Sequence, residues 1–303
     1  MRYYRSYADM IANTPMVRLG NMDFPSGVNV FAKMELLNPT GSSKDRMAKA
    51  MIEEAEREGL LSKNSVIVEA TSGNAGISIA FVSISRGYRT LVVLPTKFSQ
   101  EKHDFLRALG AEIVNTPKER GMKGAFEMVQ EILKKDRNAV CLDQFSNFAN
   151  SRIHFETTGP EIYDALDGQL DYFVSGAGTG GTLTGVMGYL RTKNKNIKGI
   201  LADPLGSTMG GGTENHYLIE GIGNSFMPKI MDMSMVDEVF KVSDDEAFQE
   251  AKQLALREGI VAGSSSGAVL AAARKLASKI TRGNIVVVLA DRGDRYFSKN
   301  LYS

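Results

Sequence analysis

Short apolar runs rich in β-branched residues alternate with amphipathic stretches along almost the whole chain. The runs predict strands at residues 29–35, 65–70, 90–95, 111–116, 139–145, 171–177, 198–204 and 284–291. Apolar positions at helical spacing predict helices at 45–59, 75–87, 99–110, 124–136, 243–259 and 266–279. Strands that are continuously apolar and alternate with helices indicate largely parallel sheets covered by helices on both faces, an α/β fold.

The length of the chain predicts two domains. At about 150 residues per domain, 303 residues suffice for two. A polar segment at 146–151 follows the predicted strand at 139–145 and marks a boundary. One compact unit is then expected over residues 47–148, and residues 1–46 are expected to return to the second unit, at 149–303. Ligands of open α/β sheets bind beyond the carboxyl ends of the strands, so the turns there are the candidate sites.

Composition excludes several classes of protein. The net charge is +1, which gives no field for a nucleic-acid backbone or an anionic membrane. No stretch approaches the roughly 20 uninterrupted apolar residues of a membrane span. Cys141 is the single cysteine, which fits a reducing compartment, and three histidines offer no ligand spacing for a metal. We expect a soluble, cytoplasmic protein without a metal.

A glycine-rich turn at residues 175–185 follows a predicted strand and opens a helix. Its backbone N–H groups and the positive end of the helix dipole suit a phosphate group, and Thr179 and Thr182 add hydroxyl donors. The spacing is neither the dinucleotide fingerprint nor a P-loop, which favours a smaller phosphate monoester. The alternative is a strand–helix turn without a ligand.

Lys44 stands where the helix after the turn at 38–43 begins. The positive end of a helix disfavours a second cation, and together with burial it lowers a lysine pKa. A neutral amine is what an imine-forming nucleophile needs. The alternative is a solvated lysine beside Asp45, and Arg46 and Lys49 look like ordinary charges.

The stretch 69–76 places hydroxyl, amide and backbone donors between a strand end and a helix start. Its candidate donors for a substrate carboxylate are Thr71, Ser72, Gly73, Asn74 and Ala75. Taken alone, the same stretch is equally a capped turn.

Together, residues 38–46, 69–77 and 175–185 resemble, in this order, the fold-type II pyridoxal-phosphate (PLP) enzymes, in particular the cysteine synthase/cystathionine β-synthase group. The resemblance extends over residues 12–19, 157–166, 220–226 and 294–302. It implies two open, twisted, mostly parallel sheets flanked by helices, as in the tryptophan synthase β chain. It also implies a larger PLP-binding domain of residues 1–46 plus 149–303, a smaller mobile domain of residues 47–148, and a homodimer.

The resemblance also implies roles for single residues. Lys44 would form the internal aldimine with PLP and move the substrate's α-proton, and Asn74 would bind the phenolic oxygen of the cofactor. The remaining assignments are the phosphate cradle of Gly178, Thr179, Gly180, Gly181 and Thr182, the substrate-binding residues Thr71, Ser72, Asn74, Ala75 and Gln144, and the bordering Gly221 and Gly223.

Three positions are less settled. Ala75 stands where relatives usually have threonine, so one hydroxyl for the substrate is missing. Relatives commonly place a serine against the pyridine nitrogen, where this chain has Asp291 or Arg292, and water or backbone is the alternative. Asp232 is a candidate base for activating the incoming nucleophile, with a purely structural role as the alternative.

The activity implied by the resemblance is PLP-dependent β-replacement on O-acetylserine, serine or cysteine through an aminoacrylate intermediate. The product would be cysteine, cystathionine or a related compound. The alternative is a cysteine β-lyase that releases hydrogen sulfide, with water as the incoming nucleophile. Two further classes are a nucleotide-binding oxidoreductase and a PLP-binding protein without turnover. The oxidoreductase needs a ribose-binding acid downstream of residues 175–185, and residues 192–199 contain no acid. The presence of Lys44 argues against a PLP-binding protein without turnover.

Overall fold

The computed structural model describes residues 3–71, 73–96 and 99–302. Among these residues two compact units are formed, the first from residues 3–11 and 38–150 and the second from residues 12–37 and 151–302. Residues 38–46 therefore pack with the unit that follows them, because Asp45 accepts hydrogen bonds from both Thr40 and Ser78. The mobility of residues 47–148 stays a prediction.

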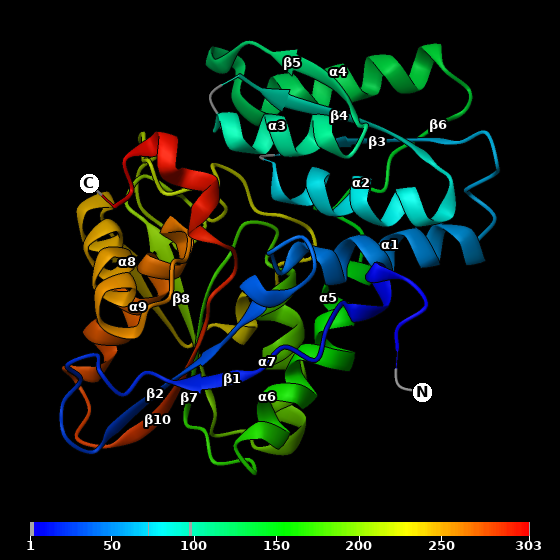
Figure 1. Ribbon diagram of the computed structural model, residues 1–303. Coiled ribbons are helices and arrows are strands. Elements are labelled where there is room, and N and C mark those ends of the chain that lie inside the picture. The colour runs from blue at the N-terminus through cyan, green and yellow to red at the C-terminus, as the bar shows by residue number, and fades with distance from the viewer. Residues whose placement is uncertain (1–2, 72, 97–98, 303) are drawn as a thin grey trace. The chain divides into compact units, whose positions relative to one another are not determined.

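The first unit is built on a four-stranded parallel sheet in the order β5-β4-β3-β6 (Figure 1). Its strands are β3 (Val66–Ala70), β4 (Arg89–Pro95), β5 (Glu112–Thr116) and β6 (Ala139–Val140), and its helices are α1 (Lys44–Arg57), α2 (Asn74–Arg86), α3 (Gln100–Ala108) and α4 (Gly121–Lys135). Alternate residues of β4 face opposite ways. Val92 and Leu94 pack with residues of α2 and α3, whereas Val93 packs with residues of α4.

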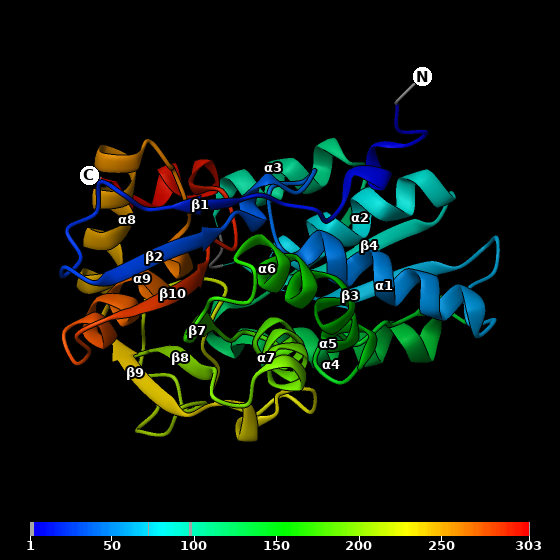
Figure 2. The same cartoon turned by 90° about the horizontal axis from the view of Figure 1, so that it is seen from below.

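The second unit contains a six-stranded sheet in the order β1-β2-β10-β7-β8-β9, in which only the β1–β2 pair is antiparallel among the described strands (Figure 2). The strands are β1 (Met16–Arg18), β2 (Val28–Lys33), β7 (Tyr172–Gly176), β8 (Lys198–Pro204), β9 (Glu238–Val242) and β10 (Gly283–Val288). Its helices include α5 (Ala149–Ile153), which begins in the first unit, α6 (Gly159–Ala165), α7 (Gly181–Lys193), α8 (Asp244–Glu258) and α9 (Ser264–Ala277).

Helices cover both faces of this larger sheet. Ile285 and Val287 of β10 pack in one core with residues of α8 and α9, while Val286 and Val288 pack in another with residues of α6 and α7 (Figure 1). Strands that are buried on both faces carry continuous apolar runs, which explains why the sequence of these strands shows no polar–apolar alternation. The predicted α/β architecture of mostly parallel sheets flanked by helices is confirmed.

Some elements differ from the prediction. The strand expected over 139–145 pairs only at Ala139–Val140, because the residues that follow leave the sheet for hydrogen bonds with Glu69. Strands β1 and β9 were not predicted; β1 has three residues, and the five residues of β9 include the charged Glu238 and Lys241, which interrupt the apolar run. Within the described ranges, no helix is long and apolar enough to cross a membrane.

Candidate functional site

Lys44 is the first residue of α1 and is half-buried. The next residue, Asp45, is fully buried and accepts hydrogen bonds from the Thr40 N–H group at 2.7 Å and from the hydroxyls of Thr40 and Ser78, the latter at 2.6 Å. Asp45 therefore ties the start of α1 to the preceding turn and to α2. This role of Asp45 was not predicted from the sequence.

Arg46 lies in a different environment from the one that the sequence predicts. The sequence suggests an ordinary charged residue, but only 1% of Arg46 is exposed. The turn before the helix is buried as well, since Asn38, Thr40, Ser42 and Ser43 are each less than 5% exposed. Lys44 thus starts its helix from a buried segment rather than from a solvated loop.

The turn between β3 and α2 presents donors near the carboxyl end of β3. The Thr71 hydroxyl accepts the Gly73 N–H at 3.0 Å, and Asn74 is the first residue of α2. Gly73 has φ 121°, and a Cβ there would lie 2.6 Å from Cδ of the buried Lys102. The positive φ favours glycine here. Ala75 is buried at the helix start. Ser72, also predicted to bind substrate, lies outside the described residues.

Gln144 reaches the same turn from the far end of the unit's sequence. Its side-chain amide donates to the Ala70 carbonyl oxygen at 3.0 Å, one residue before Thr71. The backbone carbonyl of Gln144 accepts a hydrogen bond from the Asn150 side chain at 2.8 Å, and Gln144 is 3% exposed. The structure therefore brings together Gln144 and Thr71, 73 positions apart in sequence, at one end of β3.

The second unit carries the glycine turn between β7 and α7. Gly180 has φ 86° and caps α7, and the Gly181 N–H lies 3.4 Å from the Thr179 hydroxyl. A Cβ on Gly178 would come within 2.5 Å of the Gly221 carbonyl oxygen, and one on Gly180 within 2.5 Å of Sδ of Met231. Only glycine fits these positions, and backbone N–H groups line the start of a 13-residue helix. These features fit a phosphate group.

The segment 221–224 closes against this turn. The Gly223 N–H donates to the Ala177 carbonyl at 2.8 Å, and the Asn224 side chain donates to the Gly178 carbonyl. Gly221 and Gly223, predicted to border the substrate, therefore lie beside the glycine turn. Asn224 was missed in the sequence, although it directly follows Gly223. Thr182 lies 3.2 Å from Nε2 of the buried His154, which orients its hydroxyl.

Asp291 and Arg292 follow the end of β10 but have different surroundings. Asp291 is 1% exposed and accepts a hydrogen bond from the Tyr296 hydroxyl, and its backbone carbonyl accepts the Gly263 N–H at 3.0 Å. Burial and the Asp291 charge raise the pKa of Tyr296. Arg292 is exposed and pairs with Asp294 at 2.7 Å. Of the two, Asp291 lies inside the unit, near the start of α9.

Asp232 is exposed and accepts the Ser234 N–H at 2.9 Å, which caps a short 3-10 helix at Met233–Met235. Its own N–H donates to the Thr184 hydroxyl at 3.0 Å. These contacts fully account for a structural role, and its role as a base stays a prediction.

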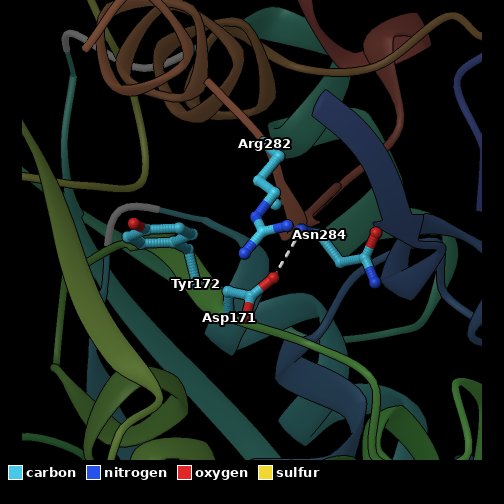
Figure 3. Close-up of a pocket in the computed structure, with 5 residues that line it drawn as sticks. Asp171, Tyr172, Arg282 and Asn284 are labelled. Atoms are coloured by element: carbon cyan, nitrogen blue, oxygen red, sulfur yellow. Dashed lines mark hydrogen bonds between the residues drawn. The ribbon is translucent and has the colours of Figure 1, made fainter. Parts of the chain in front are cut away.

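A cavity of about 310 Å³ lies elsewhere in the second unit, lined by Asp171, Tyr172, Arg282, Gly283 and Asn284 (Figure 3). The Asn284 N–H donates to the Asp171 carboxylate across it at 2.8 Å. The cavity lies where β7 and β10 begin, at the opposite strand ends from the glycine turn, so it takes no part in the site. Among the described residues, no cluster of histidine, cysteine and carboxylate side chains could hold a metal.

Comparison with known proteins agrees with this chemistry. Residues 7–291 match the family model described as "Pyridoxal-phosphate dependent enzyme". An "O-acetylserine dependent cystathionine beta-synthase" of Bacillus subtilis is 43% identical over 97% of this chain and 96% of its own. A "Cysteine synthase" of Staphylococcus aureus is 41% identical, again over 97% and 96%.

A solved structure, of a "hydrogen sulfide-producing enzyme" from Fusobacterium nucleatum, is also similar. It has a TM-score of 0.94 and 38% identity, covering 97% of this chain and all of that one. The family depends on PLP as its cofactor. The chain belongs to the pyridoxal-phosphate dependent enzymes, in the group that includes cysteine synthase and O-acetylserine-dependent cystathionine β-synthase.

Proposed function

We propose that this protein catalyses β-replacement on a serine-type amino acid, with O-acetylserine as the donor and a thiol as the incoming nucleophile. With homocysteine the product is cystathionine, and with sulfide it is cysteine. The observation that carries the proposal is the 43% identity, over 97% of the chain, with an O-acetylserine-dependent cystathionine β-synthase, in a chain that keeps Lys44 at a helix start.

PLP, when bound, supplies an electron sink that stabilises negative charge at the substrate's α-carbon. The chain supplies the rest. The phosphate would be bound by Gly178, Thr179, Gly180, Gly181 and Thr182. Lys44 would hold the cofactor through its amine, and Asn74 would bind the phenolic oxygen. The Lys44 amine would also remove the α-proton of the substrate and later return it.

The β3–α2 turn receives the substrate carboxylate. The hydroxyls of Thr71 and Ser72, the backbone N–H groups at the start of α2 and the side chain of Gln144 are the proposed donors. Ala75 contributes no hydroxyl, which weakens binding by about 1 kcal/mol, the value of one typical hydrogen bond. Gly221 and Gly223 would border the substrate, Asp291 would be the residue for the pyridine nitrogen, and Asp232 would act as base toward the thiol.

Lys44→Ala tests the assignment of the amine. Treatment with borohydride followed by peptide mapping is expected to place the cofactor mass on the peptide that carries residue 44 in the unmodified enzyme, and the variant should form no product. Lys49→Ala is the matched control, because Lys49 is a half-buried lysine of the same helix. Reduced cofactor attached elsewhere in Lys44→Ala would refute the assignment.

Product analysis distinguishes replacement from elimination. The enzyme is incubated with O-acetylserine, serine or cysteine, each with homocysteine, with sulfide or alone, and the products are identified by mass spectrometry. Cystathionine or cysteine from O-acetylserine supports β-replacement. Hydrogen sulfide from cysteine alone supports the lyase alternative, which the similarity to the sulfide-producing enzyme favours. Absence of any product from every donor would refute both activities.

We also propose a cytoplasmic homodimer and a mobile smaller domain at residues 47–148. Support for a dimer comes from three aromatic side chains near the N-terminus, Tyr3, Tyr4 and Tyr7, which are each more than half exposed. A mass of about twice 33.0 kDa by light scattering is the expected result. A single cysteine supports the reducing cytoplasm.

A further inference from the structure

Glu69 is a carboxyl group inside the sheet of the first unit that none of the steps above uses. It lies in β3, two residues before Thr71, and is 2% exposed. Buried carboxylates are rare because removing a charge from water is costly. A carboxyl at this place therefore needs a reason, and its contacts supply one.

Both oxygens of Glu69 face the segment that follows β6. Oε2 accepts the Asp143 N–H at 3.2 Å, and Oε1 accepts the Gln144 N–H at 3.0 Å. Asp143 has φ 52°, a left-handed conformation that is uncommon outside glycine. Such a residue can turn two successive N–H groups toward one anion, an arrangement that binds anions well. Here the anion is the protein's own carboxylate.

The same contacts fix Gln144. Its backbone N–H is bound by Glu69 and its side-chain amide by the carbonyl of the next residue, Ala70. Glu69 and Ala70 thus hold Gln144 from the strand that also presents Thr71. Without the carboxylate, the left-handed turn at Asp143 would lose the acceptor that compensates its strain, and the Gln144 side chain would lose its fixed position.

The groups that face Glu69 set its charge. Its pKa is raised from 4.5 to about 7: burial is the largest cause and the Asp143 charge adds to it, while the two N–H groups and the Cys141 thiol, 3.7 Å away, lower the pKa. The thiol itself stays protonated, because burial and Glu69 raise its pKa. An ionised carboxylate binds the two N–H groups more strongly than a neutral carboxyl does. The hold on Gln144 therefore changes close to neutral pH.

We propose that Glu69 is a positioning residue that holds Gln144 in place to receive the carboxylate of the amino-acid substrate. The inference rests on the proposed function, because it takes Gln144 to be a substrate ligand. Glu69 does not touch substrate or cofactor in this account; it acts through the segment 143–144.

Steady-state kinetics of Glu69→Gln test the proposal. The amide has about the same shape but presents an NH₂ group to one of the two N–H donors. KM for the amino-acid donor is expected to rise about tenfold, the effect of one lost hydrogen bond to a charged group, while kcat stays within about twofold. Glu112→Gln, an exposed carboxyl of β5 in the same sheet, is the matched control and should leave KM unchanged.

The pH dependence separates positioning from mere structural support. In the unmodified enzyme, KM for the donor should rise as pH falls through about 7, and this step should be missing in Glu69→Gln. Asp143→Asn keeps a residue that tolerates φ 52° but removes the charge that raises the Glu69 pKa, so it should move the step to lower pH. This second variant serves even where Glu69→Gln fails to fold.

Hydrogen exchange gives a readout that does not depend on turnover. In the purified holoenzyme, the amides of residues 143 and 144 should exchange faster in Glu69→Gln, while those of α9 stay protected. Unchanged KM, pH profile and exchange in Glu69→Gln would overturn the inference and leave the proposed function standing. An unmodified enzyme that forms no product from any donor would instead overturn the proposed function.

Discussion

At the scale of single residues, the glycine turn shows how little conformational freedom the proposed phosphate cradle has. Gly180 needs a positive φ, and a Cβ there would also meet Sδ and Cβ of Met231 at 2.5 and 2.7 Å. The first requirement is conformational and the second is steric. An alanine at a glycine that has only a positive φ can therefore be compared with an alanine at Gly180, which also meets a close neighbour.

We predict that Gly180→Ala weakens PLP binding by about tenfold or more, because the turn must shift and at least one N–H group loses its aim at the phosphate. Reconstitution of the stripped enzyme with PLP, followed by absorbance, measures the affinity. Gly211→Ala is the control: Gly211 has φ 84° and no atom within 4 Å of an added Cβ. Equal affinity in the two variants would show that the cradle tolerates the shift.

The residues that the sequence predicted are those whose chemistry is visible locally. Lys44 begins a helix, and the glycine turn stands between a strand and a helix, so a short stretch is enough to identify each. Asp45 and Glu69 could not be found this way, because their partners Ser78 and Gln144 are 33 and 75 positions distant. For Glu69, the available signal was an acid placed inside the apolar run at 65–70, which calls for a buried partner.

At the scale of elements, the sequence predicted best where the hydrophobic pattern alone decides. Strand β8 and helix α8 lie within one residue of their expected ends, and α8 ends at Gly259 in the left-handed conformation as its sequence indicates. The prediction was wrong at β6, where an apolar run continues but the backbone turns away to bind Glu69. A local pattern cannot show that a distant carboxyl competes for these N–H groups.

Helices α8 and α9 make contact through a glycine that the pattern does not single out. A Cβ on Gly267 of α9 would lie 1.9 Å from the Ala247 carbonyl oxygen and 3.0 Å from Cβ of Ala251, both in α8. The two helices approach each other so closely only because position 267 has no side chain. They cover one face of the larger sheet, so a change in their spacing disturbs that core.

We predict that Gly267→Ala lowers the free energy of unfolding by about 1–3 kcal/mol, the usual cost of overpacking. Urea denaturation followed by circular dichroism measures it. Gly188→Ala in α7 is the matched helical control, since an added Cβ there comes no closer than 3.4 Å to a neighbour. The control should keep or gain stability, because alanine favours helix more than glycine. Equal loss in both variants would contradict the close approach of α8 and α9.

At the scale of the whole molecule, buried and paired carboxyls set how stability depends on pH. Partners lower the pKa of two carboxyls: against the effect of burial, the Gly199 N–H and Lys198 lower that of Asp237, and Lys275 and Ser243 lower that of Glu246. As pH falls, these carboxyls are protonated in the unfolded chain at a higher pH than in the folded protein. Their contribution to stability is therefore present above about pH 4.5 and is lost in acid.

Glu69 has the opposite sign, and this leads to the prediction for the whole chain. Between its ordinary pKa of 4.5 and the folded value of about 7, the folded protein holds a proton that the unfolded chain releases. Stability should therefore fall as pH rises through this window, by an amount on the order of 3 kcal/mol. Urea denaturation at about pH 5 and about pH 8 measures the fall, and Glu69→Gln should remove most of it. The same slope in both proteins would place the titration elsewhere. The ionised Glu69 that holds Gln144 thus lowers the stability of the fold. We infer that this acid is kept inside a buried strand for its positioning role, although it costs stability.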